Sequence, residues 1–337
     1  METWNLLQNI WFLLIGVLFI GYSVLDGFDL GIGSLFPFLA KKNEEKEILC
    51  KTIGPFWDGN EVWLLTGGGA LFAAFPHTYA TVFSGFYLAL MLVLFALILR
   101  AVSLEFRSHD LKRQKLWDGA FIIGSFLPSL LYGVALGNVI QGIPLNSNMD
   151  FTGNFFTLLR PFPLLIGLFG LTAILLQGST YAALKTESRI QERSRRISQK
   201  LWLVYIILLA VSLLVSLVTL PGAARKIGAW VFTAVVVVSL IFMKWAFSTK
   251  KDGLAFFSSS LAFGGLWGIA GSIHFPNLVR DSNDPTLSLN IYNSSSSELT
   301  LKVMLIITLV GMPLVIGYTI YLYKVFKGKV RFSDEAY

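Results

Sequence analysis

Two carboxylates and an amide stand at the start of a long apolar segment. Asp58 and Glu61 are three residues apart, Asn60 lies between them, and Trp57 and Trp63 flank the group. Residues with this spacing share one face of a helix. Acids inside a membrane helix are energetically expensive and commonly serve ion or proton transfer. If the segment spans a membrane, the spacing therefore indicates a route for protons or cations.

Two further acids, Asp26 and Asp29, lie deep within the first apolar run, 8–38. The basic segment that follows this run begins at Lys41, 15 residues beyond Asp26. A continuous helix rises about 1.5 Å per residue, so Asp26 is expected roughly 20 Å from that boundary. A carboxylate at this depth faces the protein interior or a wet cavity. Both residues are candidate proton relays beside the first pair.

The alternative interpretation is that such acids pair with Lys or Arg and only fix the packing of helices. It is favoured for Glu105 and Asp118, because Arg100, Arg107 and Lys115 lie close to them in the sequence. Asp58 and Asp29 have no basic residue nearby in the sequence, which favours a functional role for these two.

Composition identifies the class of protein. Of the 337 residues, 55% are hydrophobic and only 14% are charged, whereas soluble domains carry about 25% charged residues. Apolar runs of about 20 residues recur along the chain, without the fine alternation of a β-barrel. We therefore expect an all-α polytopic membrane protein with nine transmembrane helices, at 8–38, 58–76, 79–104, 117–138, 160–184, 201–220, 227–247, 254–274 and 300–323.

The nine helices are expected to form one membrane domain, 1–337. Within it we expect a first four-helix bundle at 1–140, a second at 155–275 and an additional peripheral helix at 298–325. A weak internal repeat supports two bundles, because Leu25-Asp26-Gly27 resembles Leu176-Gln177-Gly178 about 150 residues later. Two glycine motifs, Gly31-x-Gly33 and Gly67-Gly68-Gly69, are predicted to permit close helix approach.

The distribution of basic residues predicts the orientation. Of the 27 Lys and Arg, 22 lie in five segments on one side, namely 39–57, 100–116, 185–200, 244–253 and 324–337. Cytoplasmic loops are the basic ones, so the N-terminus is expected outside and the C-terminus in the cytoplasm. The net charge of +7 is thus spread over short clusters between apolar runs, and no nucleic-acid partner is expected.

Residues that could hold a metal or haem are scarce. The single cysteine, Cys50, excludes an internal disulfide and a cysteine-based metal cluster. Of the three histidines, His77 and His274 stand at outer helix ends and His109 in a basic inner loop. Two outer histidines could in principle ligate a haem, but haem ligands usually project from within helices. We expect no cofactor and no metal bound by this chain.

Several motifs resemble subunit II of the cytochrome bd-type quinol oxidases. They include Trp57-Asp58-Gly59-Asn60-Glu61-Val62-Trp63-Leu64, Gly68-Gly69-Ala70-Leu71-Phe72-Ala73-Ala74-Phe75-Pro76 and Asp26-Gly27-Phe28-Asp29-Leu30-Gly31. The resemblance covers nearly the whole chain. It implies a subunit of an electrogenic quinol:O2 oxidoreductase in the bacterial cell membrane, with quinol and O2 as substrates of the complex.

The resemblance also implies partners and roles. Haems b558, b595 and d are expected in subunit I, and this chain is expected to stabilise that subunit. A small accessory subunit, membrane lipids and a structural quinone or lipid are further expected partners. Part of the proton route from the cytoplasm falls to Asp58 foremost, with Glu61, Asp26 and Asp29 as relays. Family members often carry Gln at the position of Glu61, which makes Glu61 the weaker candidate.

Two other functions use the same residues. An ion-coupled secondary transporter would use the intramembrane acids, and an internal repeat would suit it. A purely structural assembly partner would use them only to lock helices together.

Overall fold

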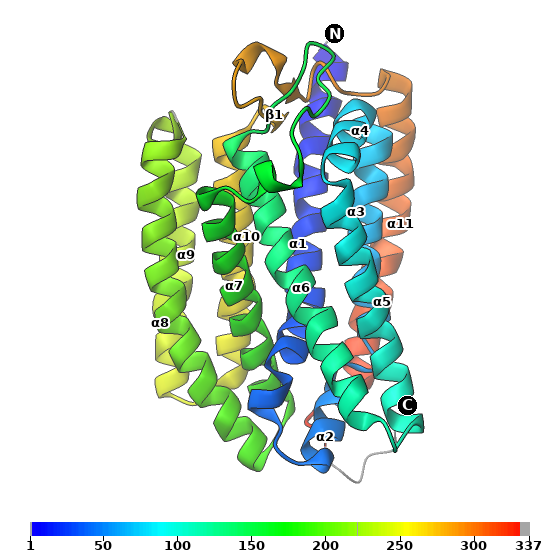
Figure 1. Ribbon diagram of the computed structural model, residues 1–337, viewed down its shortest axis with the longest axis vertical. Helices are drawn as coiled ribbons and strands as arrows, with labels where there is room; N and C mark the ends of the chain where they lie inside the picture. The colour runs from blue at the N-terminus through cyan, green and yellow to red at the C-terminus, as the bar shows by residue number, and fades with distance from the viewer. Residues whose placement is uncertain (1, 221, 331–337) are drawn as a thin grey trace.

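The computed structural model describes residues 2–220 and 222–330, and its long helices run nearly parallel to one another (Figure 1). The helices are α1 (Glu2–Leu39), α2 (Asn43–Ile53), α3 (Trp57–Ala74), α4 (Pro76–Gly85), α5 (Tyr87–His109), α6 (Gln114–Gln141), α7 (Pro161–Lys185), α8 (Ser188–Thr219), α9 (Ile227–Ser248), α10 (Asp252–His274) and α11 (Glu298–Val325). Short 3-10 helices are η1 (Phe155–Leu158), η2 (Ala223–Arg225) and η3 (Pro285–Leu287). One antiparallel pair joins β1 (Asn277–Val279) to β2 (Leu289–Asn290).

The all-helical membrane class is confirmed. Among the described residues, eight helices are long and apolar enough to span a membrane: α1, α5, α6, α7, α8, α9, α10 and α11. The one expected span that is missing from these eight is 58–76. It corresponds to α3, which has 18 residues and polar side chains in its first turns. These polar groups lower the hydropathy of α3. The nine-span count therefore stays a prediction.

Two boundaries differ from expectation. The run 79–104 was expected as one helix, but it is divided between α4 and α5 at Phe86, whose φ of −95° and ψ of 16° interrupt the helical geometry. The basic segment 185–200 was expected as a loop, but most of it forms the first turns of α8. Helix α8 therefore extends beyond its apolar part, and its first turns lie at the end of the molecule that also holds α2 (Figure 1).

Helix α1 runs through the centre of the molecule and packs against α3, α6 and α7. Close approach of α1 to α7 depends on two glycines, as Gly31 led us to expect. A Cβ on Gly31 would lie 2.3 Å from the carbonyl oxygen of Ile174, and one on Gly178 would lie 2.4 Å from the backbone of Gly31. Any larger residue would force these two helices apart. The division into bundles at 1–140 and 155–275 stays a prediction.

The two halves of the proposed repeat face each other at this seam. Nε2 of Gln177 on α7 donates to the carbonyl oxygen of Val24 on α1 over 3.1 Å, and to Oγ of Ser260 on α10 over 2.9 Å. Gln177 thus satisfies polar groups of two other helices from a fully buried position.

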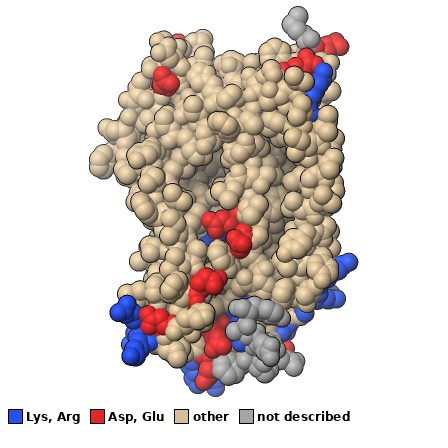
Figure 2. Space-filling model, turned by 90° about the vertical axis from the view of Figure 1, so that its right-hand side faces the viewer, with Lys and Arg blue, Asp and Glu red and all other residues tan. Residues whose placement is uncertain are grey.

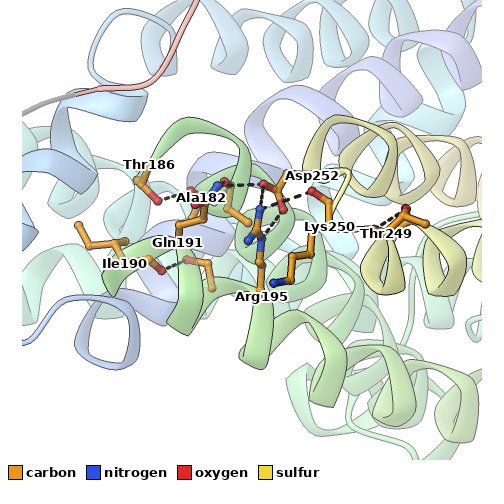
Figure 3. A network of polar contacts seen from close by, with 11 residues as sticks. Ala182, Thr186, Ile190, Gln191, Arg195, Thr249, Lys250 and Asp252 are labelled. Atoms are coloured by element: carbon orange, nitrogen blue, oxygen red, sulfur yellow. Dashed lines mark hydrogen bonds and ion pairs between the residues drawn. The ribbon is translucent and has the colours of Figure 1, made fainter. Parts of the chain in front are cut away.

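A polar network ties the N-terminal parts of α8 and α10 together (Figure 3). Arg195 of α8 donates to both carboxylate oxygens of Asp252, from Nε over 2.8 Å and from Nη2 over 2.7 Å. Nε2 of Gln191 donates to the same carboxylate over 2.9 Å. Asp252 stands in the first turn of α10, where a carboxylate also interacts favourably with the helix dipole.

Candidate functional site

A buried arginine connects three helices in the interior. Arg100 of α5 has no exposed side-chain surface, and its Nη1 donates to Oδ1 of Asp26 on α1 over 2.6 Å. Its Nη2 donates to Oε2 of Glu61 on α3 over 3.0 Å. Asp26 is also fully buried, whereas the Glu61 side chain is 23% exposed. The planar guanidinium presents several donors in a fixed fork, which lets one side chain hold two acids from different helices.

Asp29 lies beside this cluster and has a neutral partner. It follows Asp26 by three residues on the same helix and is fully buried. Nδ2 of Asn60 on α3 donates to its Oδ2 over 2.8 Å and also reaches the carbonyl oxygen of Leu25 over 3.3 Å. Two residues of one motif are thus connected to the two acids of α1: Asn60 contacts Asp29 directly, and Glu61 is linked to Asp26 through Arg100.

The cluster leaves polar atoms without partners. Oδ2 of Asp26, Oδ1 of Asp29 and Nε of Arg100 are buried and accept or donate no hydrogen bond among the described residues. Leaving a buried polar atom unpaired costs about 1–3 kcal/mol, and more for a charged group. A water molecule would supply each carboxylate oxygen with a hydrogen bond, and a proton would remove the charge of the carboxylate.

Charge balance supports the same point. Within the cluster, Asp26, Asp29 and Glu61 face the single cation Arg100, so three ionised acids would leave a net charge of −2. Uncompensated charge is costly in a low-dielectric interior. Uptake of a proton by one of the three acids would reduce this net charge and would therefore be electrostatically favourable.

Asp58, the foremost sequence candidate, is not part of the buried cluster. It is exposed on the outer face of α3, one helical turn before Glu61. Residues three apart on a helix have Cβ atoms about 5–6 Å apart, so Asp58 is a neighbour of the half-exposed Glu61. Figure 2 shows the side of the molecule on which α3 lies, where acidic side chains extend from mid-height towards the basic end.

Sequence reasoning missed two tyrosines that extend the cluster. The hydroxyl of Tyr22, one turn before Asp26 on α1, donates to the hydroxyl of Tyr132 on α6 over 3.0 Å. Tyr22 is buried. The sequence could have indicated Tyr22, because it precedes Asp26 by four residues on the same helix. It could not have indicated Tyr132, which only the packing of α6 against α1 brings close to Tyr22.

The placement of Arg100 corrects the sequence analysis. It was counted with the cytoplasmic segment 100–116, but α5 continues to His109 and Arg100 points into the interior. The expectation that Asp118 serves packing is confirmed, because it forms ion pairs with Lys46 over 2.7 Å and with Arg107 over 2.7 Å. Glu105 is exposed, and no ion pair to it is found within residues 2–220 and 222–330.

The three histidines have different surroundings. Nε2 of His77 lies 3.2 Å from the carbonyl oxygen of Asn148, and His109 contacts the backbone of Glu105 over 2.9 Å. His274 is buried at the end of α10. In the part of the chain that the structure describes, no group of three His, Cys, Asp or Glu could hold a metal ion. The absence of a cofactor in this chain stays a prediction.

Fold and site together define an integral membrane protein that holds ion-paired acids inside the bilayer. The sequence profile of cytochrome bd terminal oxidase subunit II matches residues 7–326. The chain belongs to this family.

Individual proteins agree with the family assignment. The chain is 36% identical to the cytochrome bd-I ubiquinol oxidase subunit 2 of Escherichia coli strain K12, over 99% of this chain and 98% of that one. It is also 36% identical to the cytochrome bd ubiquinol oxidase subunit 2 of Bacillus subtilis, over 97% and 98%. A chain of the bd oxidase from Geobacillus thermodenitrificans has the same fold, with a TM-score of 0.81, 17% identity and coverage of 95% and 98%.

Proposed function

We propose that this chain is the second subunit of a bacterial membrane complex that oxidises quinol and reduces O2 to water. The whole-length match to the family and to two ubiquinol oxidase subunits supports the proposal. The reaction class is that of an oxidoreductase whose redox centres, haems b558, b595 and d, reside in subunit I. Family membership does not favour the alternative of an ion-coupled transporter.

The exposed face of α3 supports a partner subunit. Asp58 and Glu61 lie among exposed apolar side chains, including Val62, Leu65 and Phe72. Acids facing lipid at this depth would be costly. Coverage of this face by subunit I removes the acids from lipid and places them at the boundary between the two chains.

The chain contributes a proton route through this boundary. Asp58 and Glu61 form its accessible part, and Asp26 and Asp29 form its interior part. Arg100 contacts an acid of each part and holds them in register. One observation carries this proposal: Arg100 forms ion pairs both with Glu61, whose side chain is 23% exposed, and with the fully buried Asp26. Acids, hydroxyls and ordered waters pass a proton stepwise where a bare charge would be too costly.

Orientation gives the route its direction. Basic residues concentrate at the end of the molecule that holds α2, which we assign to the cytoplasm, and the N-terminus lies at the other end (Figures 1 and 2). Protons for O2 reduction then enter from the cytoplasm. Each charge moved across the membrane potential is worth about 2.3 kcal/mol per 100 mV, so one-sided uptake makes the reaction electrogenic. An accessory subunit and a structural quinone or lipid remain part of the proposal.

Purification through this chain tests the proposal. We expect a larger subunit to copurify, with the visible bands of haem b and haem d and with quinol-dependent O2 consumption. A chain that purifies without haem and without a large partner would contradict it.

A further inference from the structure

A basic cavity lies at the cytoplasmic end, between the turn that joins α1 to α2 and the first turns of α8. Its volume is about 300 Å³. Five cations and two acids line it: Lys41, Lys42, Glu45, Arg189, Glu192, Arg193 and Arg196. The cations outnumber the acids, so the fully ionised lining carries a net charge of +3.

The acids of the cavity already have partners. Glu45 accepts from the backbone N–H groups of Lys41 and Lys42, over 2.6 and 3.2 Å, and forms an ion pair with Arg193. Burial alone would raise the pKa of Glu45, but these hydrogen bonds outweigh it and lower the pKa. Glu45 is therefore an ionised structural acid that orders the turn, not a group free to neutralise the other cations.

Several cations of the cavity lack a counter-charge. Among the described residues, no acid forms an ion pair with Lys42 or Arg189. Nη1 of Arg193 has no hydrogen-bond partner within the same residues, but this atom is buried and does not face the cavity. The cations that can contact an anion in the cavity without losing a protein counter-charge are therefore the exposed Lys42 and Arg189.

Backbone groups add to the positive potential. Helix α2 begins at Asn43, directly after Lys42, and α8 begins at Ser188, directly before Arg189. The first N–H groups of a helix have no partner inside the helix and carry the positive end of its dipole. Two helix starts thus flank the cavity on the sides where the unpaired cations stand.

We propose that this cavity binds a phosphate-bearing anion, and that its source is the headgroup of an anionic phospholipid of the inner leaflet. Arginine forks suit phosphate oxygens, and basic pockets between membrane helices on the cytoplasmic side bind such headgroups. The cavity adjoins the last turn of membrane helix α1, where Phe38 is 60% exposed three residues before Lys41. An acyl chain has an apolar surface there, which a free phosphate ion would not need.

The site is separate from the acid cluster around Arg100. Its occupant would stabilise the contact between α1, α2 and α8 in the membrane. Binding is accordingly independent of the proton route, and it can fail while the proposed oxidase function stands.

The test compares lipid retention by the purified complex. The probe is phosphatidylglycerol added to the detergent-solubilised complex, with phosphatidylcholine as the neutral comparison, and bound lipid is counted by native mass spectrometry. The test variant is Lys42→Gln/Arg189→Gln. The control is Lys112→Gln/Arg113→Gln, which removes the same charge from the exposed α5–α6 turn. Unchanged haem bands show that each complex is assembled.

We expect the test variant to retain at least about fivefold less phosphatidylglycerol than the wild-type complex. The control should retain the wild-type amount. A parallel arm adds inorganic phosphate at millimolar concentration. If phosphate displaces the lipid only weakly, the source is the headgroup; if phosphate binds and phosphatidylglycerol binds no better than phosphatidylcholine, the source is free phosphate. Equal retention by test variant and control, with no effect of phosphate, overturns the proposal.

Should the double variant fail to assemble, the single variant Arg189→Gln replaces it, because Arg189 is exposed and removing it leaves the Glu45–Arg193 pair intact. Its expected loss is at least about twofold. Wild-type retention by this variant also counts against the site.

Discussion

Nη1 of Arg100 on α5 lies 2.6 Å from Oδ1 of Asp26 on α1, and neither side chain has any exposed surface. The two residues are 74 positions apart in the chain. The ion pair therefore fixes α5 against the central helix in the interior of the protein. Since Arg100 also holds Glu61 of α3, the position of three helices depends on one guanidinium.

Replacement of Arg100 by Gln is expected to destabilise the complex. Removing one partner of a buried ion pair costs about 3–5 kcal/mol, because the other charge remains buried without compensation. Arg100→Lys should not restore stability, since a single ammonium cannot hold two carboxylates in a planar fork. Thermal unfolding of the purified complex checks both variants.

The double variant Arg100→Gln/Asp26→Asn supplies the control, because it removes both charges of the pair. It should be more stable than Arg100→Gln alone. An Arg100→Gln complex with the wild-type melting temperature would show that the pair does not support the fold.

Gly31→Ala is expected to disrupt the seam between α1 and α7. The added methyl group would lie 2.3 Å from a backbone carbonyl oxygen, which cannot move without shifting α7. Overpacking of this kind costs about 1–3 kcal/mol or more. The matched control is Gly119→Ala on α6, where nothing lies within 4 Å of the added carbon. Yield and melting temperature should fall for the first variant only; equal values for both would contradict the close approach.

The sequence shows some of these features and hides others for physical reasons. Hydropathy alone reveals the apolar helices, and the rarity of acids in apolar runs marks Asp26 and Asp29 as buried. The partner of Asp26 is hidden because Arg100 lies near the end of an apolar run, where a basic residue usually marks the cytoplasmic loop. Only the register of α5 against α1 turns it inward, and register is a property of packing between distant segments.

The relation of Asp58 to Glu61 shows the same limit. Their spacing correctly predicts a shared helix face, but both stand near its edge, so that Glu61 reaches Arg100 whereas Asp58 remains on the surface. Which of two neighbouring acids turns inward depends on the rotation of α3 about its axis. Packing against α1 sets that rotation, and no local pattern encodes it.

Asp252→Asn is expected to loosen the contact between the N-terminal parts of α8 and α10. It weakens the two-pronged contact with Arg195, and hydrogen bonds to charged groups contribute about 1.5–3 kcal/mol. Glu192→Gln removes an acid whose pair with Arg196 spans 3.8 Å between exposed side chains, so its effect should stay below about 1 kcal/mol. Denaturation curves compare the two. A larger effect for Glu192→Gln would contradict the network in Figure 3.

Cys50 of α2 is expected to react slowly with thiol reagents. Burial raises the pKa of its thiol to about 12, and Arg107 opposes this only in part. At pH 8 the folded protein then holds almost no thiolate, whereas an unfolded cysteine with a pKa near 8.5 holds roughly a quarter. Alkylation by iodoacetamide should be at least about 100-fold slower before unfolding than after it.

The raised pKa of Cys50 makes the stability of the fold depend on pH. Above about pH 8.5 the unfolded state releases the thiol proton and the folded state keeps it, so the free energy of unfolding falls as the pH rises. Cys50→Ser should flatten this decline. Rapid alkylation of the folded complex at pH 8 would show that the thiol is accessible and ionised.

The central claim is that protons reach the reaction through the acids of α3 and α1. Its most direct measurement is proton uptake from the medium, followed with a pH-sensitive dye while the fully reduced complex reacts with O2. The variants are Asp58→Asn on α3 and Asp29→Asn on α1, and the control is Glu44→Gln, an exposed acid of α2 outside the cluster. We predict uptake at least about tenfold slower in both variants, with haem bands intact and the control unchanged. Wild-type uptake in assembled variants would contradict the account.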